Sequence, residues 1–248
     1  MPWTSSGKYL PARRAVCKRT LTDNNMTTKL FFQALTKFLA GLLLVGLSLF
    51  LPSGTFDFWQ AWLFIGILFG PMFIAGIVLM VRQPDLLRKR LSAKEEQNEQ
   101  KRVVALSGLL FVAMFVVAGL NFRFGWLLLP EWTTYVAAVI FLISYALYAE
   151  VMRENIWLSR TIEVQENQQV VSTGLYGIVR HPMYSATLLL FLSMPLVLNS
   201  VFSFILMLLY IPVIALRIRN EEQVLERELN GYTEYKQRVK YKLIPYIW

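Results

Sequence analysis

Residues 58–81 read FWQAWLFIGILFGPMFIAGIVLMV, an apolar block that holds no charged side chain. Asp57 and Arg82 bound the block on either side. A helix rises ~1.5 Å per residue, so a helix over this block is long enough to cross the ~30 Å hydrocarbon core of a bilayer. The block therefore predicts a membrane-spanning helix.

Further apolar blocks accompany this one, and together they make the chain 56% hydrophobic with a mean hydropathy of +0.46. Soluble domains of this length are rarely so apolar. The last two blocks are about 16 residues each and are separated only by Asn199 and Ser200, which predicts a short helical hairpin. The sequence thus predicts an all-α, polytopic membrane helix bundle with six apolar helices, at roughly 31–51, 58–81, 103–122, 132–152, 183–198 and 201–216.

Positive charge is distributed unevenly between the polar segments. In a soluble protein a net charge of +9 would suggest a nucleic-acid partner. Here the loops 52–57 and 121–131 together hold a single cation, Arg123, whereas 23 of the 25 Lys and Arg residues lie in the other polar segments. Because cationic loops stay in the cytoplasm, we expect a multi-pass integral membrane protein with both termini cytoplasmic, and no nucleic-acid partner.

Three regions follow from this pattern. Residues 1–28 form a polar, basic tail that we expect to be disordered. Residues 29–152 should hold four transmembrane helices. Residues 153–248 contain the apolar hairpin and two polar segments that face the same side, so a cytoplasmic C-terminal helix and loop there are the expected place for a functional site.

The most unusual polar stretch is STGLYGIVRHPMY, residues 172–184, which contains the only histidine of the chain. Pro182 suits the first turn of the helix that follows, where its missing N–H has no cost. The loop then lies at a helix N-terminus, whose free N–H groups favour a carboxylate or phosphate. The same residues also suit an anchor of Arg and Tyr at the membrane interface, and they do not decide between the two.

The second polar stretch is RIRNEE, residues 217–222. No Gly or Pro occurs between 213 and 230, so the last apolar helix should continue into the cytoplasm and end in a left-handed cap at Asn230-Gly231. On this helix Arg217 and Glu221 share one face, and Arg219 and Glu222 share another. Taken alone, the spacing favours ion pairs on a charged helix surface. The sequence has no histidine cluster, so we expect no metal site.

Together these segments resemble the isoprenylcysteine carboxyl methyltransferase family and its phospholipid methyltransferase relatives, which are integral membrane methyltransferases. The resemblance covers about residues 150–248. Its elements are QQVVSTGLYGIVRHPMY, the apolar hairpin, RIRNEE and a Y-x-x-Y-x-x-x-V tail. The arginine-histidine-proline motif alone is short, but paired glutamates about 40 residues later, beyond an apolar hairpin, make the combination specific.

The resemblance implies methyl transfer from S-adenosylmethionine (SAM) to a lipophilic or membrane-embedded acceptor. Such an acceptor is the carboxylate of a prenylated cysteine, a phospholipid amine or a similar group, and the expected partners are this lipid substrate and the membrane lipids. Arg217 and Glu221 are the implied catalytic residues, with Arg217 facing the substrate. The implied cofactor contacts are Gln168, Gln169, Val170, Val171, Tyr176, His181, Pro182, Met183, Tyr184 and Glu221.

Two other functions stay open. The ending VKYKLIPYIW, residues 239–248, is similar to that of NADPH-dependent membrane sterol reductases, although Met183 and the Glu221-Glu222 pair favour a methyltransferase. A non-enzymatic transporter or assembly protein is the third. Its ion path would usually place ionisable residues at mid-depth in the membrane, whereas Lys37 and Glu150 lie near the ends of their apolar segments.

Overall fold

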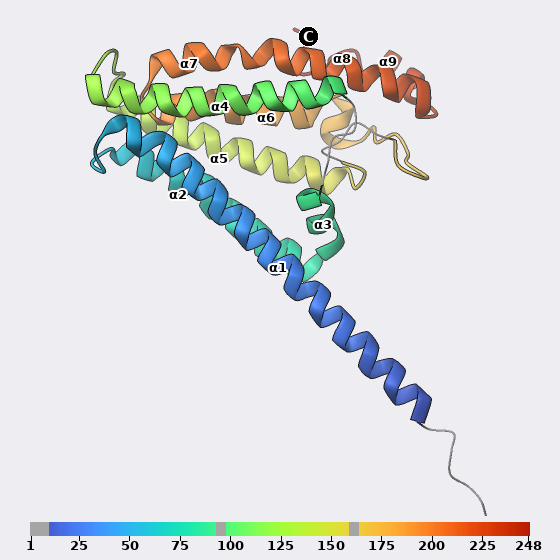
Figure 1. Ribbon diagram of the computed structural model, residues 1–248. Coiled ribbons are helices and arrows are strands. Elements are labelled where there is room, and N and C mark those ends of the chain that lie inside the picture. Colours follow the sequence, from blue (N-terminus) through green and yellow to red (C-terminus); the bar gives the residue numbers. More distant parts are fainter. Residues whose placement is uncertain (1–9, 93–97, 159–163) are drawn as a thin grey trace, which may run out of the picture.

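The computed structural model describes residues 10–92, 98–158 and 164–248. The described residues form helices and connecting loops, without a strand, as Figure 1 shows. The helices are α1 (Leu10–Ser53), α2 (Trp59–Arg82), α3 (Pro84–Ser92), α4 (Asn98–Phe124), α5 (Glu131–Glu154), η1 (Gly174–Gly177), α6 (Pro182–Val197), α7 (Val201–Leu208), α8 (Tyr210–Glu228) and α9 (Tyr232–Arg238).

The predicted membrane bundle is confirmed. Segments long and apolar enough to span a membrane are Thr28–Ser53, Trp59–Arg82, Val103–Phe124, Glu131–Glu154 and Val201–Glu228. The helix α6 is apolar but only 16 residues long, as expected for the first arm of the hairpin. The second arm is longer than the block 201–216, because α8 continues beyond the apolar residues to Glu228. This continuation carries the RIRNEE stretch beyond the apolar part of the helix.

The N-terminal segment differs from the expectation. The helix α1 begins at Leu10, so the part of the expected disordered tail from residue 10 onward is helical, and residues 1–9 lie outside the described residues. No proline occurs between Ala12 and Leu51, so no residue interrupts the backbone hydrogen bonds of α1 over this length. The helix therefore extends well beyond the bundle (Figure 1).

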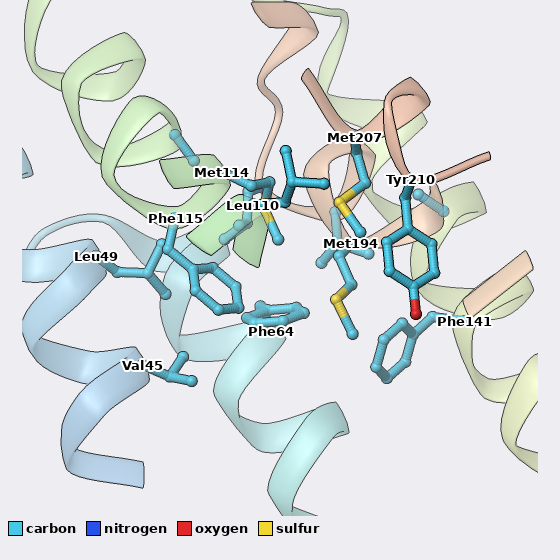
Figure 2. Packing of buried hydrophobic residues seen from close by; sticks show 14 of the residues in the cluster. Val45, Leu49, Phe64, Leu110, Met114, Phe115, Phe141, Met194, Met207 and Tyr210 are labelled. Carbon is cyan, nitrogen blue, oxygen red and sulfur yellow. The ribbon is translucent and has the colours of Figure 1, made fainter. Parts of the chain in front are cut away.

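The core lies where α1, α2, α4, α5, α6, α7 and α8 meet, and Figure 2 shows its side chains converging from these helices. Leu49, Phe64, Met114, Phe141 and Met207 are completely buried there. Many other large apolar side chains face outward, as a lipid-embedded surface requires. Association of helices in lipid depends on close packing rather than on the hydrophobic effect, and small residues permit that packing.

One glycine shows how close the packing is. A Cβ atom on Gly119 of α4 would lie 2.5 Å from the carbonyl oxygen of Leu49 on α1. Real Cβ atoms do not approach a carbonyl oxygen so closely, so the two backbones can meet here only because residue 119 has no side chain.

The turn of the α6–α7 hairpin is fixed by polar side chains. Asn199 adopts a left-handed conformation, with φ 55°, and its side chain bonds both backbone groups of Leu129, at 2.6 Å to the nitrogen and 2.9 Å to the oxygen. Ser200 caps α7 by accepting the N–H of Ser203 at 3.3 Å. These bonds attach the hairpin to the α4–α5 loop. The opposite ends of α6 and α8 are thereby held side by side, where the site lies.

Candidate functional site

A cavity opens where the loop after α5, the start of α6 and the outer half of α8 meet. It contains about 830 Å³ of space, the solvent at its mouth included. Its lining residues are Asn155, Trp157, Leu158, Gln168, Gln169, Val170, Val171, Tyr176, Arg180, His181, Met183, Tyr184, Arg217, Glu221, Val224, Leu225, Leu229, Tyr232 and Tyr235. The structure thus brings together Arg217 and all the implied cofactor contacts except Pro182, which is buried in the first turn of α6 beside the lining.

The loop that carries His181 is bound by the C-terminal segment of the chain. The N–H groups of Arg180 and His181 donate to the carbonyl oxygens of Tyr241 and Lys242, each at 2.9 Å. The hydroxyl of Ser185 donates to the carbonyl of Leu243 at 2.6 Å. These backbone donors are therefore occupied by the protein itself, contrary to the expectation that the N–H groups of the loop would be free for an anion.

A buried charged cluster lies behind the loop. The Arg180 Nε donates to Glu222 Oε1 at 2.8 Å, and His181 Nε2 lies 3.1 Å from the same oxygen. Lys242 Nζ lies 3.5 Å from the other carboxylate oxygen. Arg180 also donates to the carbonyls of Val239 and Lys240, at 2.8 Å and 2.7 Å. A buried ion pair is stable only when its remaining donors and acceptors are satisfied, and this cluster meets that condition.

This arrangement corrects one prediction. Glu222 was expected on a charged surface with Arg219, but Glu222 is buried and Arg219 is exposed. The inward face of α8 runs through Ile214, Ile218 and Glu222 at a spacing of four residues, and this face packs against the bundle. Arg219 and Glu222 are three residues apart on the helix, as predicted. Because Glu222 is on the buried side, however, it pairs with Arg180 and not with Arg219.

The other glutamate of the pair faces the cavity. The hydroxyl of Tyr184 donates to Glu221 Oε2 at 2.5 Å and accepts a hydrogen bond from Arg217 Nε at 2.9 Å. The second oxygen, Glu221 Oε1, lies 3.8 Å from His181 Nδ1. The phenol of Tyr184 therefore links the two residues to which the resemblance gives catalytic roles. Glu221 and His181 together form a wall suited to a cationic ligand.

The opposite wall depends on Gly174. The carboxylate of Glu154, at the end of α5, accepts the N–H of Leu175 at 2.9 Å. A Cβ atom on Gly174 would lie 1.6 Å from that carboxylate, and the residue has φ +54°. Only glycine suits both conditions. The close approach places η1, and with it Tyr176, against the cavity.

Tyr176 is held in place by two polar partners. Asn155 Nδ2 donates to its hydroxyl at 3.0 Å, and the hydroxyl of Tyr235 donates to its carbonyl at 2.7 Å. Burial raises the pKa of the Tyr176 phenol to about 12, and the phenol is therefore neutral at physiological pH.

The helix α9 completes the lining with residues that were not predicted. Gly231 has φ 85°, which is the left-handed conformation expected at the end of the long helix, and it turns the chain into α9. Tyr232 and Tyr235 of α9 and Val224 and Leu225 of α8 then face the cavity. Val224 and Leu225 lie three and four residues after Glu221, and Tyr232 and Tyr235 lie three residues apart, so helical spacing was a usable signal. Nothing in the sequence pointed to Trp157.

Comparisons with known proteins agree with this geometry. Residues 132–230 match the family model described as phospholipid methyltransferase. A solved structure of the eukaryotic intramembrane Ras methyltransferase ICMT (isoprenylcysteine carboxyl methyltransferase) is similar, with a TM-score of 0.55 and 16% sequence identity. That likeness covers 94% of this chain and 87% of the other, and at this identity it concerns the fold.

A curated relative points toward a different activity. Delta(14)-sterol reductase TM7SF2 of Mus musculus is 32% identical over 91 residues, which are 36% of this chain and 22% of the relative. The chain therefore spans about a fifth of that protein's length. The family match lies over α5 to α8, the helices that build the cavity. Residues 132–230 thus resemble the phospholipid methyltransferase family, and the chain has a membrane fold similar to that of isoprenylcysteine carboxyl methyltransferase.

Proposed function

We propose that the protein transfers a methyl group from SAM to a lipophilic, membrane-embedded acceptor at the cytoplasmic face of the membrane. The observation that carries the proposal is that the residues implied for the cofactor meet at one cavity. Residues 168–171, the 176–184 loop and Glu221 are far apart in sequence, yet they line one cavity together with Arg217. An interfacial anchor or a solvated helix surface requires no such meeting.

The side chains of the cavity suit the chemical groups of SAM. Glu221 and His181 offer acceptors to its ammonium group, and a charged hydrogen bond of this kind contributes about 1.5–3 kcal/mol. Tyr176 and Trp157 offer aromatic faces for the adenine or the sulfonium, with a cation–π contact contributing roughly 0.5–2 kcal/mol. Val170, Val171 and the apolar residues of α8 suit the adenosine.

When bound, SAM supplies an activated methyl group, so the protein contributes chiefly binding and orientation. The displacement at the methyl carbon is in line, and orienting two reactants can lower the barrier by ~7–11 kcal/mol. In the proposal Glu221, held by Tyr184, fixes the cofactor. Arg217 holds an anionic acceptor through its guanidinium group. A carboxylate acceptor is already ionised at neutral pH and needs no general base.

The position of the cavity agrees with an acceptor that stays in the membrane. The helix α8 carries Arg217 at the point where its apolar residues give way to polar ones. An acceptor with an apolar chain would reach Arg217 from between the helices, while SAM would enter from the cytoplasm. This requires the termini to be cytoplasmic, as the distribution of Lys and Arg predicts.

The second candidate is an NADPH-dependent sterol or isoprenoid double-bond reductase, which the 91-residue likeness to Delta(14)-sterol reductase favours. The family match to phospholipid methyltransferase favours the first candidate. Calorimetric titration of the purified protein separates the two. We expect S-adenosylhomocysteine to bind with a micromolar or lower Kd and NADPH not to bind. Binding of NADPH without binding of S-adenosylhomocysteine would overturn the proposal.

A further inference from the structure

The two buried tyrosines of α9 differ in the hydrogen bonding of their hydroxyl groups. Tyr232 and Tyr235 are both almost completely buried, at 3% and 2% exposure, and both line the cavity. The hydroxyl of Tyr235 donates to the carbonyl of Tyr176 at 2.7 Å. Among the described residues, the hydroxyl of Tyr232 has no hydrogen-bond partner. The two side chains thus have the same chemistry in the same environment, and one of them lacks a partner within the protein.

A buried hydroxyl without a partner costs about 1–3 kcal/mol, so such groups are rare in native proteins and call for an explanation. The position of Tyr232 is not accidental. Gly231 turns the chain in a left-handed conformation immediately before it, and the ring packs in a cluster with Leu229, Tyr235 and Val239. The fold therefore buries the hydroxyl of a cavity-lining side chain without a partner, at an energetic cost that a ligand can offset.

The chemistry of the hydroxyl restricts what the ligand atom can be. Burial, followed by the nearby carboxylates of Glu222 and Glu221, raises the pKa of the Tyr232 phenol far above its usual range. The phenol is thus protonated at any physiological pH and can donate. Glu222 is already bonded to Arg180 and His181, and Glu221 to Tyr184. The missing partner is therefore an acceptor on the ligand.

We propose that the Tyr232 hydroxyl binds the carboxylate at the amino-acid end of the cofactor. This inference rests on the proposed function, in which Glu221 binds the ammonium group of SAM. The ammonium and the carboxylate are attached to the same carbon, so fixing one places the other nearby. The N–H groups of Arg180 and His181, which could have bound a carboxylate, are occupied by the carbonyls of Tyr241 and Lys242. Tyr232 supplies a donor that the loop does not.

Tyr232→Phe and Tyr235→Phe test this inference as a matched pair, in the full chain purified in detergent. Each variant is measured by thermal unfolding without ligand and by calorimetry with S-adenosylhomocysteine. Tyr232→Phe should leave Tm unchanged or raise it, yet weaken binding roughly 10- to 100-fold, the loss expected for a hydrogen bond to a charged group. Tyr235→Phe should lower Tm, and because its hydroxyl holds Tyr176 in place, it should weaken the binding of adenosine ligands with and without the amino-acid end to the same extent.

A second ligand locates the contact. The compound 5′-methylthioadenosine lacks the amino-acid end, so its Kd should be the same for the wild type and Tyr232→Phe. An equal loss of affinity for both ligands would place the contact on the adenosine and overturn the assignment, as would an unchanged Kd for S-adenosylhomocysteine. A wild-type protein that binds neither ligand would instead overturn the proposed function, which the wild-type titration shows before any variant is made.

Discussion

The hairpin formed by α6 with α7 and α8 has a buried polar cluster at each end, and the two clusters differ in whether the protein satisfies all their polar groups. At the turn, Ser200 bonds to Ser203, Ser203 bonds to the backbone of α4, and Asn199 bonds to the backbone of the α4–α5 loop. At the other end, Glu222 is equally well bonded, but Glu221 and Tyr232 line a cavity, and the buried Tyr232 hydroxyl has no partner among the described residues. A cluster that satisfies itself serves the fold, whereas one that lines a cavity and leaves a donor without a partner is built for a ligand.

The largest expected effect concerns the ion pair behind the site. Arg180→Met leaves the buried carboxylate of Glu222 without its guanidinium partner and should cost about 3–5 kcal/mol of stability. Adding Glu222→Leu removes the unpaired charge and should recover most of the loss. Glu226→Gln is the control on the same helix, because its partner Lys236 is near the surface and the pair should contribute under about 1 kcal/mol. Thermal unfolding in detergent measures all three. A double variant no more stable than Arg180→Met would contradict this account of the cluster.

A smaller effect is expected at the turn. Asn199→Ala removes two hydrogen bonds to Leu129 and should reduce stability by roughly 1–3 kcal/mol. Because this cluster has no group facing the cavity, the Kd for S-adenosylhomocysteine of the folded protein should stay within about twofold of the wild type, a limit set by the absence of any lost ligand contact. A tenfold weaker Kd with only a small loss of stability would show that the two ends are not independent.

An effect on stability similar to that of Asn199→Ala is expected from Gly174→Ala. The left-handed backbone costs an alanine about 1–2 kcal/mol, and the Glu154 carboxylate must move away from the N–H of Leu175. Since this contact positions Tyr176, ligand affinity should fall as well. Gly108→Ala is the matched control, because Gly108 lies within α4 and a Cβ atom there meets nothing within 4 Å. Its Tm should be equal to that of the wild type or higher. Equal Tm and Kd values for Gly174→Ala and Gly108→Ala would show that Gly174 does not position Tyr176.

The sequence predicted features that depend on neighbouring residues and missed those that join distant segments. The charge-free blocks predicted the spans because a bilayer tolerates few alternatives to an apolar helix. Asn230-Gly231 predicted the end of the long helix because its conformational requirement is local. The Arg180–Glu222 pair and the docking of residues 239–243 on the His181 loop were missed, because they join segments about 40 to 60 residues apart. The family resemblance included the α9 tyrosines in its Y-x-x-Y-x-x-x-V element but assigned them no role, and Trp157 lay outside its motifs.

In the proposed site, Glu221 binds SAM and Arg217 binds the acceptor. Wild type, Glu221→Gln and Arg217→Ala are incubated in lipid nanodiscs with SAM labelled in its methyl group, and label in the organic extract is measured beside the Kd for S-adenosylhomocysteine. We expect labelled lipid from the wild type, binding weakened by ~1.5–3 kcal/mol in Glu221→Gln, and nearly normal binding with strongly reduced transfer in Arg217→Ala. No label from the wild type, or equal and small effects of both substitutions, would contradict this assignment.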